Sequence, residues 1–573
     1  MPLVRRFRLP ALFCALAVLV CELIAQPYAS MGICDDGPYV LMARTLANTG
    51  HIVYNGWAAP MLGWQLYIGA AFIKLFGFSF TSVRMSTLLV AMALAFLLQR
   101  TLVRANISER NATIGTLALV LSPLYLMLSV TYMTDIFGLF AIVICLYGCL
   151  RALQAPTQRS TIAWLCFAVA TNALFGTARQ IAWLGILVMV PSTLWLLRTQ
   201  RRVLFAGAVA DLAGALFILA CMLWFLHQPY NVHEHLLPDT FPIAHTLWQL
   251  SYTFLDIPFL LLPIVALLVP QIRKCRPFVI AVICLLSFGY LVITLQPQHR
   301  HGFFVLEPTQ GDWVSVYGFY MSMTHGGIPV FLHTNVQVLL TIASFGGLLG
   351  LIAVLFRSDA TSSSKDRSTG IAWRQLAVLL APFAMTNLLL LAPRAASSRL
   401  FDRYALELLV VALLCLVRYY QERIQPQLPP ASVLLVSAVA MYGVAVTHSM
   451  YSFYRTRVAL AAELRSDGVP DTSVDNGFEY NFGVELQHAN FLNDARITLP
   501  KNTYVPTPPL PDGTCPMLWY DDTPHIHPLY GISFDPNACY GPAPFAPVHY
   551  SRWPYRTPGT LYVVRYTPPD AKP

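Results

Sequence analysis

Apolar runs of membrane-spanning length recur along most of the chain. A transmembrane helix needs about 20 mostly apolar residues, and by this criterion the sequence predicts about thirteen spans. The first follows the basic cluster Arg5-Arg6-Phe7-Arg8 and is longer than the apolar core of a signal peptide, so we expect it to be retained. The predicted spans lie near residues 10–27, 81–98, 112–130, 136–153, 161–178, 181–197, 203–226, 254–270, 278–295, 335–356, 375–392, 404–419 and 431–448.

The positions of lysine and arginine predict the orientation of these spans. Basic residues concentrate in the cytoplasmic loops of membrane proteins. With the N-terminus in the cytoplasm, 20 of the 37 basic residues fall in cytoplasmic segments and 8 in the opposite loops before residue 450. An odd number of spans then places the C-terminal tail outside the cytoplasm. We therefore expect a multi-pass protein of the inner (plasma) membrane with an extracytoplasmic C-terminal domain.

The chain divides by composition into a membrane region, 1–450, and a polar tail, 451–573. The tail holds 18 of the 41 prolines, a density that excludes long helices over most of it. Its first part, 451–467, has a helical pattern, and 561–566 has the pattern of a strand. Together the two regions predict an all-α polytopic membrane fold followed by a small α+β domain. Outside the cytoplasm, the tail's Cys515 and Cys539 are candidates for a disulfide.

Overall composition supports this class and excludes others. The chain has 573 residues, of which 56% are hydrophobic and 11% charged, and its mean hydropathy is +0.57. Soluble domains carry about a quarter charged residues, which argues against a soluble enzyme. The abundance of Leu, Val, Phe and Ile argues against a disordered chain and a collagen. The net charge of +9 reflects few acids rather than a dense basic face, so we expect membrane lipid and no nucleic acid as a partner.

The first outer loop, about 28–80, carries the first candidate chemistry. Cys34-Asp35-Asp36-Gly37-Pro38-Tyr39 places two adjacent carboxylates at the outer edge of the membrane. Proline suits the first position of a helix, and apolar residues at helical spacing follow it. We expect two helices lying in the membrane interface, one after Pro38 and one over 60–76.

Three acids on the outer face have two readings. Asp35, Asp36 and Asp135 each precede or begin a predicted helix, where an acid favours the positive end of the helix dipole. Alternatively, a carboxylate beside the membrane takes a proton from an acceptor hydroxyl as general base, and a second acid orients the acceptor or helps to hold a metal. Convergence of acids from two loops on one surface favours the second reading.

Other polar groups have simpler interpretations. His233-Glu234-His235 and His299-Arg300-His301 bind a metal only if a further ligand converges on them, so we interpret both as loop segments. Asp211 lies close to Arg201 and Arg202 and is expected to form a local ion pair. For Arg403 the simplest alternative to a functional role is a pair with Glu407, four residues later on one helix face.

In this order, the features resemble the GT-C class of polyprenyl-phosphate-dependent glycosyltransferases. That class includes protein O-mannosyltransferases and bacterial lipid A aminoarabinose or galacturonic acid transferases. The shared features are an acidic pair opening the first outer loop, interfacial helices, an acid after the third span, and an outer C-terminal domain. Segments similar to bacterial members are Thr177-Ala178-Arg179-Gln180, Phe401-Asp402-Arg403-Tyr404 and Gly477-Phe478-Glu479-Tyr480-Asn481.

The resemblance implies roles for individual residues. Asp35 takes the place of the catalytic base, Asp36 that of the second acid of the pair, and Asp135 that of the acid which places the acceptor or a metal. Arg403 and Tyr404 match a pair at the last outer loop that suits the donor phosphate, because guanidinium binds phosphate through paired hydrogen bonds.

One departure from the relatives concerns the first loop. Many carry a basic residue before its proline, whereas this chain has Ala58-Ala59-Pro60-Met61. Other cations must then meet the phosphate charge. The candidates are Arg84, Arg179, Arg394, Arg399 and Arg403.

The implied activity is transfer of a sugar from a polyprenyl-phosphate donor to a lipid, glycan or protein acceptor, by one inverting displacement. No cofactor is assigned with certainty, and a divalent cation is left open. The main alternative is a lipid or polysaccharide-precursor transporter without covalent chemistry, for which inverted repeats and midplane charges are expected. A noncatalytic scaffold is a third reading, but it leaves the three acids unexplained.

Overall fold

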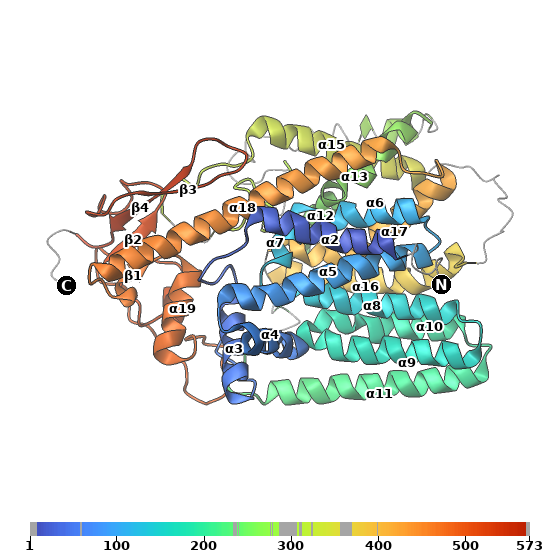
Figure 1. Cartoon of the computed structure of the whole chain (residues 1–573), viewed down its shortest axis with the longest axis horizontal. Helices are drawn as coiled ribbons and strands as arrows, with labels where there is room; N and C mark the ends of the chain where they lie inside the picture. The colour runs from blue at the N-terminus through green and yellow to red at the C-terminus, as the bar shows by residue number, and fades with distance from the viewer. Residues whose placement is uncertain are drawn as a thin grey trace.

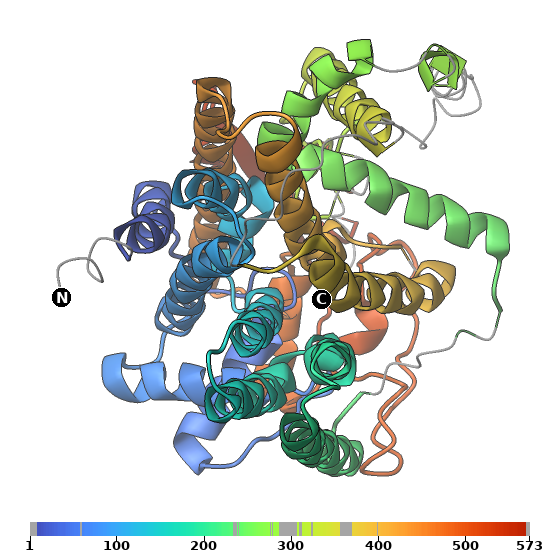
Figure 2. The ribbon, with the colours of Figure 1, turned by 90° about the vertical axis from the view of Figure 1, so that its right-hand side faces the viewer.

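The chain folds into a long helical bundle with a small sheet at one end (Figure 1). The computed structural model describes residues 8–57, 60–232, 238, 240–274, 277, 279–282, 284–285, 306–308, 312–321, 325–355, 370–397 and 399–568. Most helices run along the long axis of the molecule and are seen end-on when it is turned by 90° (Figure 2).

Helices account for nearly all of the regular structure. The α-helices are α2 (Leu9–Ala25), α3 (Asp36–Thr49), α4 (Gly63–Phe76), α5 (Phe80–Arg104), α6 (Glu109–Val120), α7 (Pro123–Ser129), α8 (Asp135–Leu153), α9 (Gln158–Phe175), α10 (Val190–Leu196), α11 (Arg201–Leu226), α12 (Ile243–Leu260), α13 (Leu262–Val265), α15 (Thr334–Leu355), α16 (Trp373–Ser397), α17 (Leu406–Arg423), α18 (Pro430–Ser466) and α19 (Phe478–Ala489). Tighter or wider turns are η1 (Gly176–Ala178), η2 (Gln180–Trp183), η3 (Gly185–Met189), η4 (Ala266–Lys274), η6 (Asp402–Ala405), η7 (Asp471–Ser473) and η8 (Tyr520–Asp522).

Eight helices of the described part are long and apolar enough to cross a membrane, or up to ten if each of two bent pairs is one span. The eight coincide with predicted spans and confirm a multi-pass membrane protein. They are α5, α8, α9, α11, α15, α16, α17 and α18, with α9 counted through η1 and α17 through η6. Of these, α8 and α17 are the most buried, whereas α11 and α16 leave most of their surface exposed.

The remaining predicted spans differ from simple helices. The run 112–130 is broken into α6 and α7, which meet at 70°, and 254–270 falls on a second pair bent by 71°. The first break has a local cause, because Ser122 caps α7 by accepting a hydrogen bond from the Tyr125 amide and Pro123 begins that helix. The apolar helices Leu9–Ala25 and Gln180–Leu196 lie at the predicted spans 10–27 and 181–197 but are too short to count among the eight, and 278–295 lies largely outside the described residues. The count of thirteen stays a prediction.

The end of the bundle that carries the sheet also holds the first outer loop. Helices α3 and α4 lie across this end, next to α19 (Figure 1). Both helices predicted in this loop are thus present, and their place in the membrane interface stays a prediction. The long helix α18 begins in the bundle and continues to Ser466 beside the sheet. It therefore passes residue 450 without a break, and the division into 1–450 and 451–573 stays a prediction.

The sheet has four short strands in the order β1-β2-β4-β3. They are β1 (Val474–Asp475), β2 (Tyr530–Ser533), β3 (Val548–Tyr550) and β4 (Gly559–Arg565). β1 pairs with β2 in parallel, and β4 pairs antiparallel with both β2 and β3. The helical start of the tail and the strand at 561–566 are thus confirmed, and the disulfide between Cys515 and Cys539 is present.

Candidate active site

Asp35 lies at the start of α3 but does not cap it. Its side chain makes no capping hydrogen bond to the helix. Instead, Oδ2 lies 3.5 Å from Nη2 of Arg403, which is 368 residues away in the chain. The Asp35 side chain remains 21% exposed, whereas that of Arg403 is 8% exposed. The site thus has a carboxylate that is held by a cation and still reachable from outside.

Arg403 contacts a second acid that the sequence did not single out. Its Nε lies 3.7 Å from Oδ2 of Asp312, and the Asp312 side chain is 5% exposed. The neighbouring Asp402 fixes this geometry, because its carboxylate accepts hydrogen bonds from the Val314 amide at 2.7 Å and the Arg403 amide at 2.7 Å. Arg403 forms no ion pair with Glu407 within the described residues, so the simple helical pair is not realised.

Three guanidinium groups surround the ring of Tyr404. The guanidinium carbons of Arg179, Arg394 and Arg403 lie 5.5, 5.8 and 5.7 Å from the ring centroid. Arg394 also donates a hydrogen bond to the Tyr404 hydroxyl at 3.3 Å. An aromatic face attracts cations, so this ring holds together charges that otherwise repel. The result is a group of three guanidinium groups next to Asp35, of which Arg179 and Arg403 also pair with acids.

Asp135 begins α8 and pairs with Arg179. The Asp135 side chain is 2% exposed and that of Arg179 is 14% exposed. The carboxylate is close enough to Asp35 for its charge to raise the pKa of that group. The acid and the cation predicted from two separate outer segments therefore meet at this site.

Asp36 and Arg84 form a closed, fully buried pair beneath the site. Arg84 Nε donates to Asp36 Oδ2 at 2.7 Å and Nη2 donates to Oδ1 at 2.9 Å, with both side chains 0% exposed. Arg84 also donates to the backbone oxygens of Ala29 and Met31. The Tyr132 amide in turn donates to Asp36. This pair ties the loop before Asp35 to the loop before Asp135.

Helix α4 fixes the segment that carries Arg179. The Trp64 amide donates to Thr177 Oγ1 at 3.1 Å, and the Trp64 indole donates to the Phe175 oxygen at 2.6 Å. The approach is so close that a Cβ on Gly63 would lie 2.0 Å from Thr177 Oγ1. Only glycine at position 63 allows this contact.

The tail attaches to the same loop through α19. Glu479 forms a buried ion pair with Arg457 of α18, 3.1 Å between charged atoms, and accepts a hydrogen bond from the Tyr454 hydroxyl at 2.5 Å. Its Cβ would meet a Cβ added to Gly32 at 3.6 Å. The segment Gly477-Phe478-Glu479-Tyr480-Asn481 thus lies against the turn that leads to Asp35.

Burial and neighbouring charges shift the pKa values of Asp35 and Asp312. Burial raises the pKa of the Asp35 carboxyl above its usual value, and Arg403 partly opposes this shift. Burial likewise raises the pKa of Asp312 to about 6, again opposed by Arg403. An acid with a raised pKa is a stronger base once it is ionised.

The sequence did not identify Asp312 as a site residue, and it indicated Arg394 only as one of five candidate cations. Asp312 follows a polar, irregular stretch with no helical or strand pattern, and nothing in that pattern indicated which residue would turn inward. Arg394 was one of several cations in the last outer loop. Its spacing of ten residues from Tyr404 carried no signal, because the two side chains lie on different elements, α16 and η6, and meet only in the folded chain.

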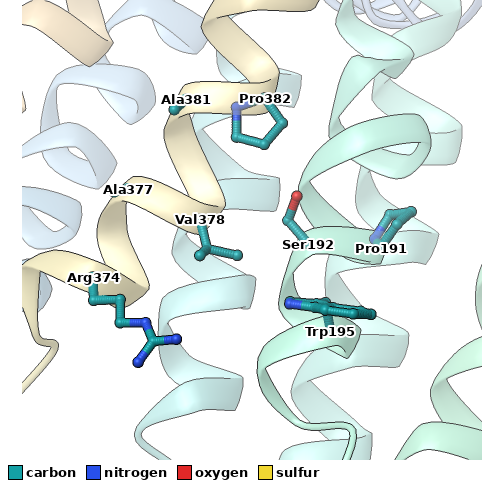
Figure 3. A pocket seen from close by; sticks show the side chains of 8 residues that line it. All are labelled: Pro191, Ser192, Trp195, Arg374, Ala377, Val378, Ala381 and Pro382. Carbon is teal, nitrogen blue, oxygen red and sulfur yellow. The ribbon is translucent and has the colours of Figure 1, made fainter.

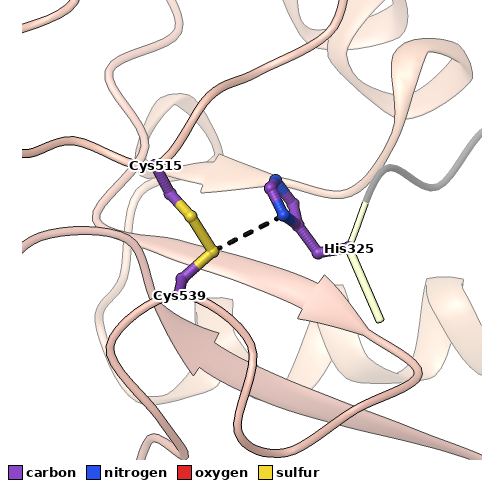
Figure 4. A group of neighbouring side chains, drawn as sticks. All are labelled: His325, Cys515 and Cys539. Carbon is purple, nitrogen blue, oxygen red and sulfur yellow. Dashed lines mark hydrogen bonds between the residues drawn. A yellow bond between two sulfur atoms is a disulfide. The ribbon is translucent and has the colours of Figure 1, made fainter. Parts of the chain in front are cut away.

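The structure leaves the two candidate metal groups of the sequence untested. Both His233-Glu234-His235 and His299-Arg300-His301 lie outside the described residues. Elsewhere in the described part, one group of ligand atoms lies close together: His325, Cys515 and Cys539. Both sulfurs are joined in the disulfide, with the His325 ring 3.6 Å from Cys539 Sγ (Figure 4), so this group holds no free thiolate for a metal.

Fold and site together define a polytopic membrane protein in which acids and arginines from distant segments meet at one end of the helices. Residues 58–227 match the family model of dolichyl-phosphate-mannose-protein mannosyltransferases. The matched segment includes α4, α8 and the Arg179 segment. The match confirms the resemblance to GT-C glycosyltransferases. A search of curated proteins finds no match.

Solved structures of membrane glycosyltransferases are also similar to the chain. ArnT from Cupriavidus metallidurans bound to undecaprenyl phosphate is 13% identical over 97% of this chain and 98% of its own, with a TM-score of 0.43. The Archaeoglobus fulgidus oligosaccharyltransferase with Zn and sulfate is 16% identical over 78% and 55%, with a TM-score of 0.41. The S. cerevisiae protein O-mannosyltransferase Pmt1-Pmt2 complex bound to the sugar donor is 14% identical over 39% and 33%, with a TM-score of 0.31.

Proposed function

We propose that the chain is an integral-membrane glycosyltransferase. It moves a sugar from a polyprenyl-phosphate donor to a lipid, glycan or protein acceptor on the extracytoplasmic face. The observation that carries the proposal is the exposed edge of the Asp35 carboxylate beside three guanidinium groups around Tyr404. Displacement of a phosphate by a hydroxyl requires a base for the hydroxyl proton and cations that bind the leaving phosphate.

In this proposal Asp35 is the general base. Its carboxylate takes the proton from the acceptor hydroxyl while that oxygen attacks the anomeric carbon of the sugar. The bond from the anomeric carbon to the phosphate oxygen breaks with its electron pair, and a glycosidic bond forms on the opposite face. The configuration is inverted because there is one displacement.

The arginines receive the leaving phosphate. Arg403, Arg179 and Arg394 stabilise the negative charge that builds on it, through charge-assisted hydrogen bonds in a largely buried setting. Tyr404 keeps these side chains together when the site is empty of donor. Asp135 orients Arg179, and Asp312 orients Arg403, so both acids are positioning residues.

Asp36 and Arg84 act through the backbone. Each satisfies the charge of the other, and neither side chain is exposed. Their role in the proposal is to fix the position of Asp35 relative to the loop before Asp135.

Transfer in purified membranes tests the proposal. Membranes containing the full chain receive radiolabelled polyprenyl-phosphate sugars, and labelled products are separated by size and solubility. Label in a lipid, glycan or protein product supports the enzyme and identifies the acceptor class. A parallel sample with EDTA tests the open question of a divalent cation.

The same membranes test the transporter alternative. Movement of labelled lipid across vesicles, without any transferred product and with equal rates in wild type and Asp35→Asn, would contradict the proposal. A glycosyltransferase predicts instead that product formation depends on Asp35.

A further inference from the structure

An apolar groove runs between α10 and α16, away from the site described above. Its volume is about 640 Å³, within the range of lipid and small-molecule sites. The walls are formed by Pro191 and Trp195 of α10 and by Ala377, Val378 and Ala381 of α16 (Figure 3). The small side chains of α16 leave room along its length for an acyl chain.

One end of the groove carries an arginine. Arg374 lies at this end, and its side chain points toward the α10 wall (Figure 3). Arg374 is exposed and has no ion-pair or hydrogen-bond partner among the described residues. The guanidinium carbon of Arg198 lies 4.7 Å from the ring centroid of Trp195. Trp195, which lines the groove together with Arg374, thus also carries the cation of Arg198, and this tryptophan is 61% exposed.

The position of the groove indicates which molecule reaches it. Its helix α16 is one of the spans with the least buried surface, so the groove opens toward lipid. Arg374 and Arg394 are on the same helix, and twenty residues of helix separate them by about 30 Å. The basic end is therefore at the opposite membrane face from the Tyr404 cluster, where tryptophan and arginine commonly meet lipid head groups.

We propose that this groove binds one anionic phospholipid of the leaflet opposite the candidate active site. Its phosphate lies between Arg374 and Arg198, and one acyl chain lies along the small residues of α16. Basic pockets between transmembrane helices on the cytoplasmic side bind anionic head groups in this manner. The proposal goes beyond glycosyl transfer and is independent of it, because no group of the donor site takes part.

Native mass spectrometry of the purified full chain tests this proposal. The protein is titrated with phosphatidylglycerol or phosphatidylcholine of identical acyl chains, and retained lipid is counted. We expect phosphatidylglycerol to be retained at least about fivefold better, since each arginine near a membrane surface contributes about that factor. Arg374→Gln should remove about fivefold of that preference. Equal retention of both lipids by the wild type, or an unchanged preference in Arg374→Gln, would overturn the proposal.

Two further variants distinguish the effect of general surface charge from that of the groove itself. Arg423→Gln removes an exposed arginine at the end of the neighbouring α17 and should leave the preference unchanged. An equal loss in Arg423→Gln would mean that general surface charge is responsible. Ala377→Trp keeps both arginines but fills the groove, and it should lower retention of both lipids. A wild-type dimer that dissociates in Ala377→Trp would assign the groove to a second copy and overturn the proposal.

Discussion

Asp35 and Asp36 are neighbours of identical chemistry, yet their carboxylates have opposite surroundings. Asp36 is enclosed by Arg84 and two backbone amides, so every oxygen is satisfied and none is exposed. Asp35 meets one guanidinium at 3.5 Å and keeps an open edge. At the scale of single residues, the hydrogen-bond partners and the exposure of each carboxylate therefore determine which of the two acids can react.

The charge of Arg403 should control the protonation of Asp35. Arg403 lowers the pKa that burial raises, so Arg403→Gln should raise that pKa further. The base is active only when ionised, and the acid limb of the pH profile of kcat/KM should therefore move to higher pH in Arg403→Gln. Arg403→Lys keeps the charge and should leave the limb near its wild-type position. An unchanged limb in Arg403→Gln would show that the titrating group is not Asp35.

The buried pair should matter for stability rather than for chemistry. Arg84→Met leaves the Asp36 carboxylate buried without a cation, which costs about 3–5 kcal/mol. Thermal unfolding of the purified protein should show a clear fall in melting temperature. The exposed pair Arg465–Asp471 is the matched control, since Arg465→Gln should cost less than about 1 kcal/mol. Equal shifts for the two variants would contradict a structural role for Asp36 and Arg84.

At the scale of helices and loops, the site depends on how separate elements dock. Helix α4 approaches η1 without room for a side chain at position 63, and the loop that carries Asp312 is held by Asp402. Each contact joins segments more than 80 residues apart. Gly63 and Asp402 thus help to determine where Arg179 and Arg403 lie, although neither is assigned a step in the reaction.

A methyl group at position 63 should disturb Arg179 without touching it. Gly63→Ala forces α4 away from Thr177, and a shift of about 1 Å in a positioned group lowers rates by tenfold or more. Initial rates of transfer in membranes measure the effect. Gly483→Ala is the control, because a Cβ there meets no atom within 4 Å. Wild-type rates in Gly63→Ala would mean that α4 does not position the site.

Element by element, the sequence predicted what periodicity and length encode. The eight long helices, the two helices of the first outer loop and the strand near residue 561 follow from apolar pattern and turn residues. The bend between α6 and α7 was not predicted, since 112–130 was expected to be one span. The signal for it is Ser122-Pro123, because proline begins a helix more easily than it continues one. The pairing of Arg403 with Asp35 and Asp312 could not be predicted, since contacts between segments far apart in the chain leave no local pattern.

At the scale of the whole molecule, α18 joins the membrane bundle to the sheet, and α19 returns the tail to the first outer loop. Arg457 and Glu479, both fully buried, form this link. The tail therefore packs against the loop that carries the candidate site. If the site faces outward, the tail must face outward as well.

The disulfide provides a test of that orientation. Cys515 and Cys539 are joined in the tail, so a membrane-impermeant reductant followed by a membrane-impermeant maleimide should label them in intact cells. The double variant Cys515→Ser/Cys539→Ser should lose this label. Labelling that appears only after the cells are opened would place the tail in the cytoplasm and contradict the proposed topology.

The most direct measurement of the central claim is the rate of sugar transfer by Asp35→Asn. Asparagine keeps the size of the side chain but does not accept the proton, so the rate should fall by roughly 10²–10⁴-fold, with the melting temperature close to that of wild type. Asp467→Asn, an exposed acid at the end of α18, is the control and should transfer at the wild-type rate. Full activity in folded Asp35→Asn would contradict the assignment of Asp35 as the base.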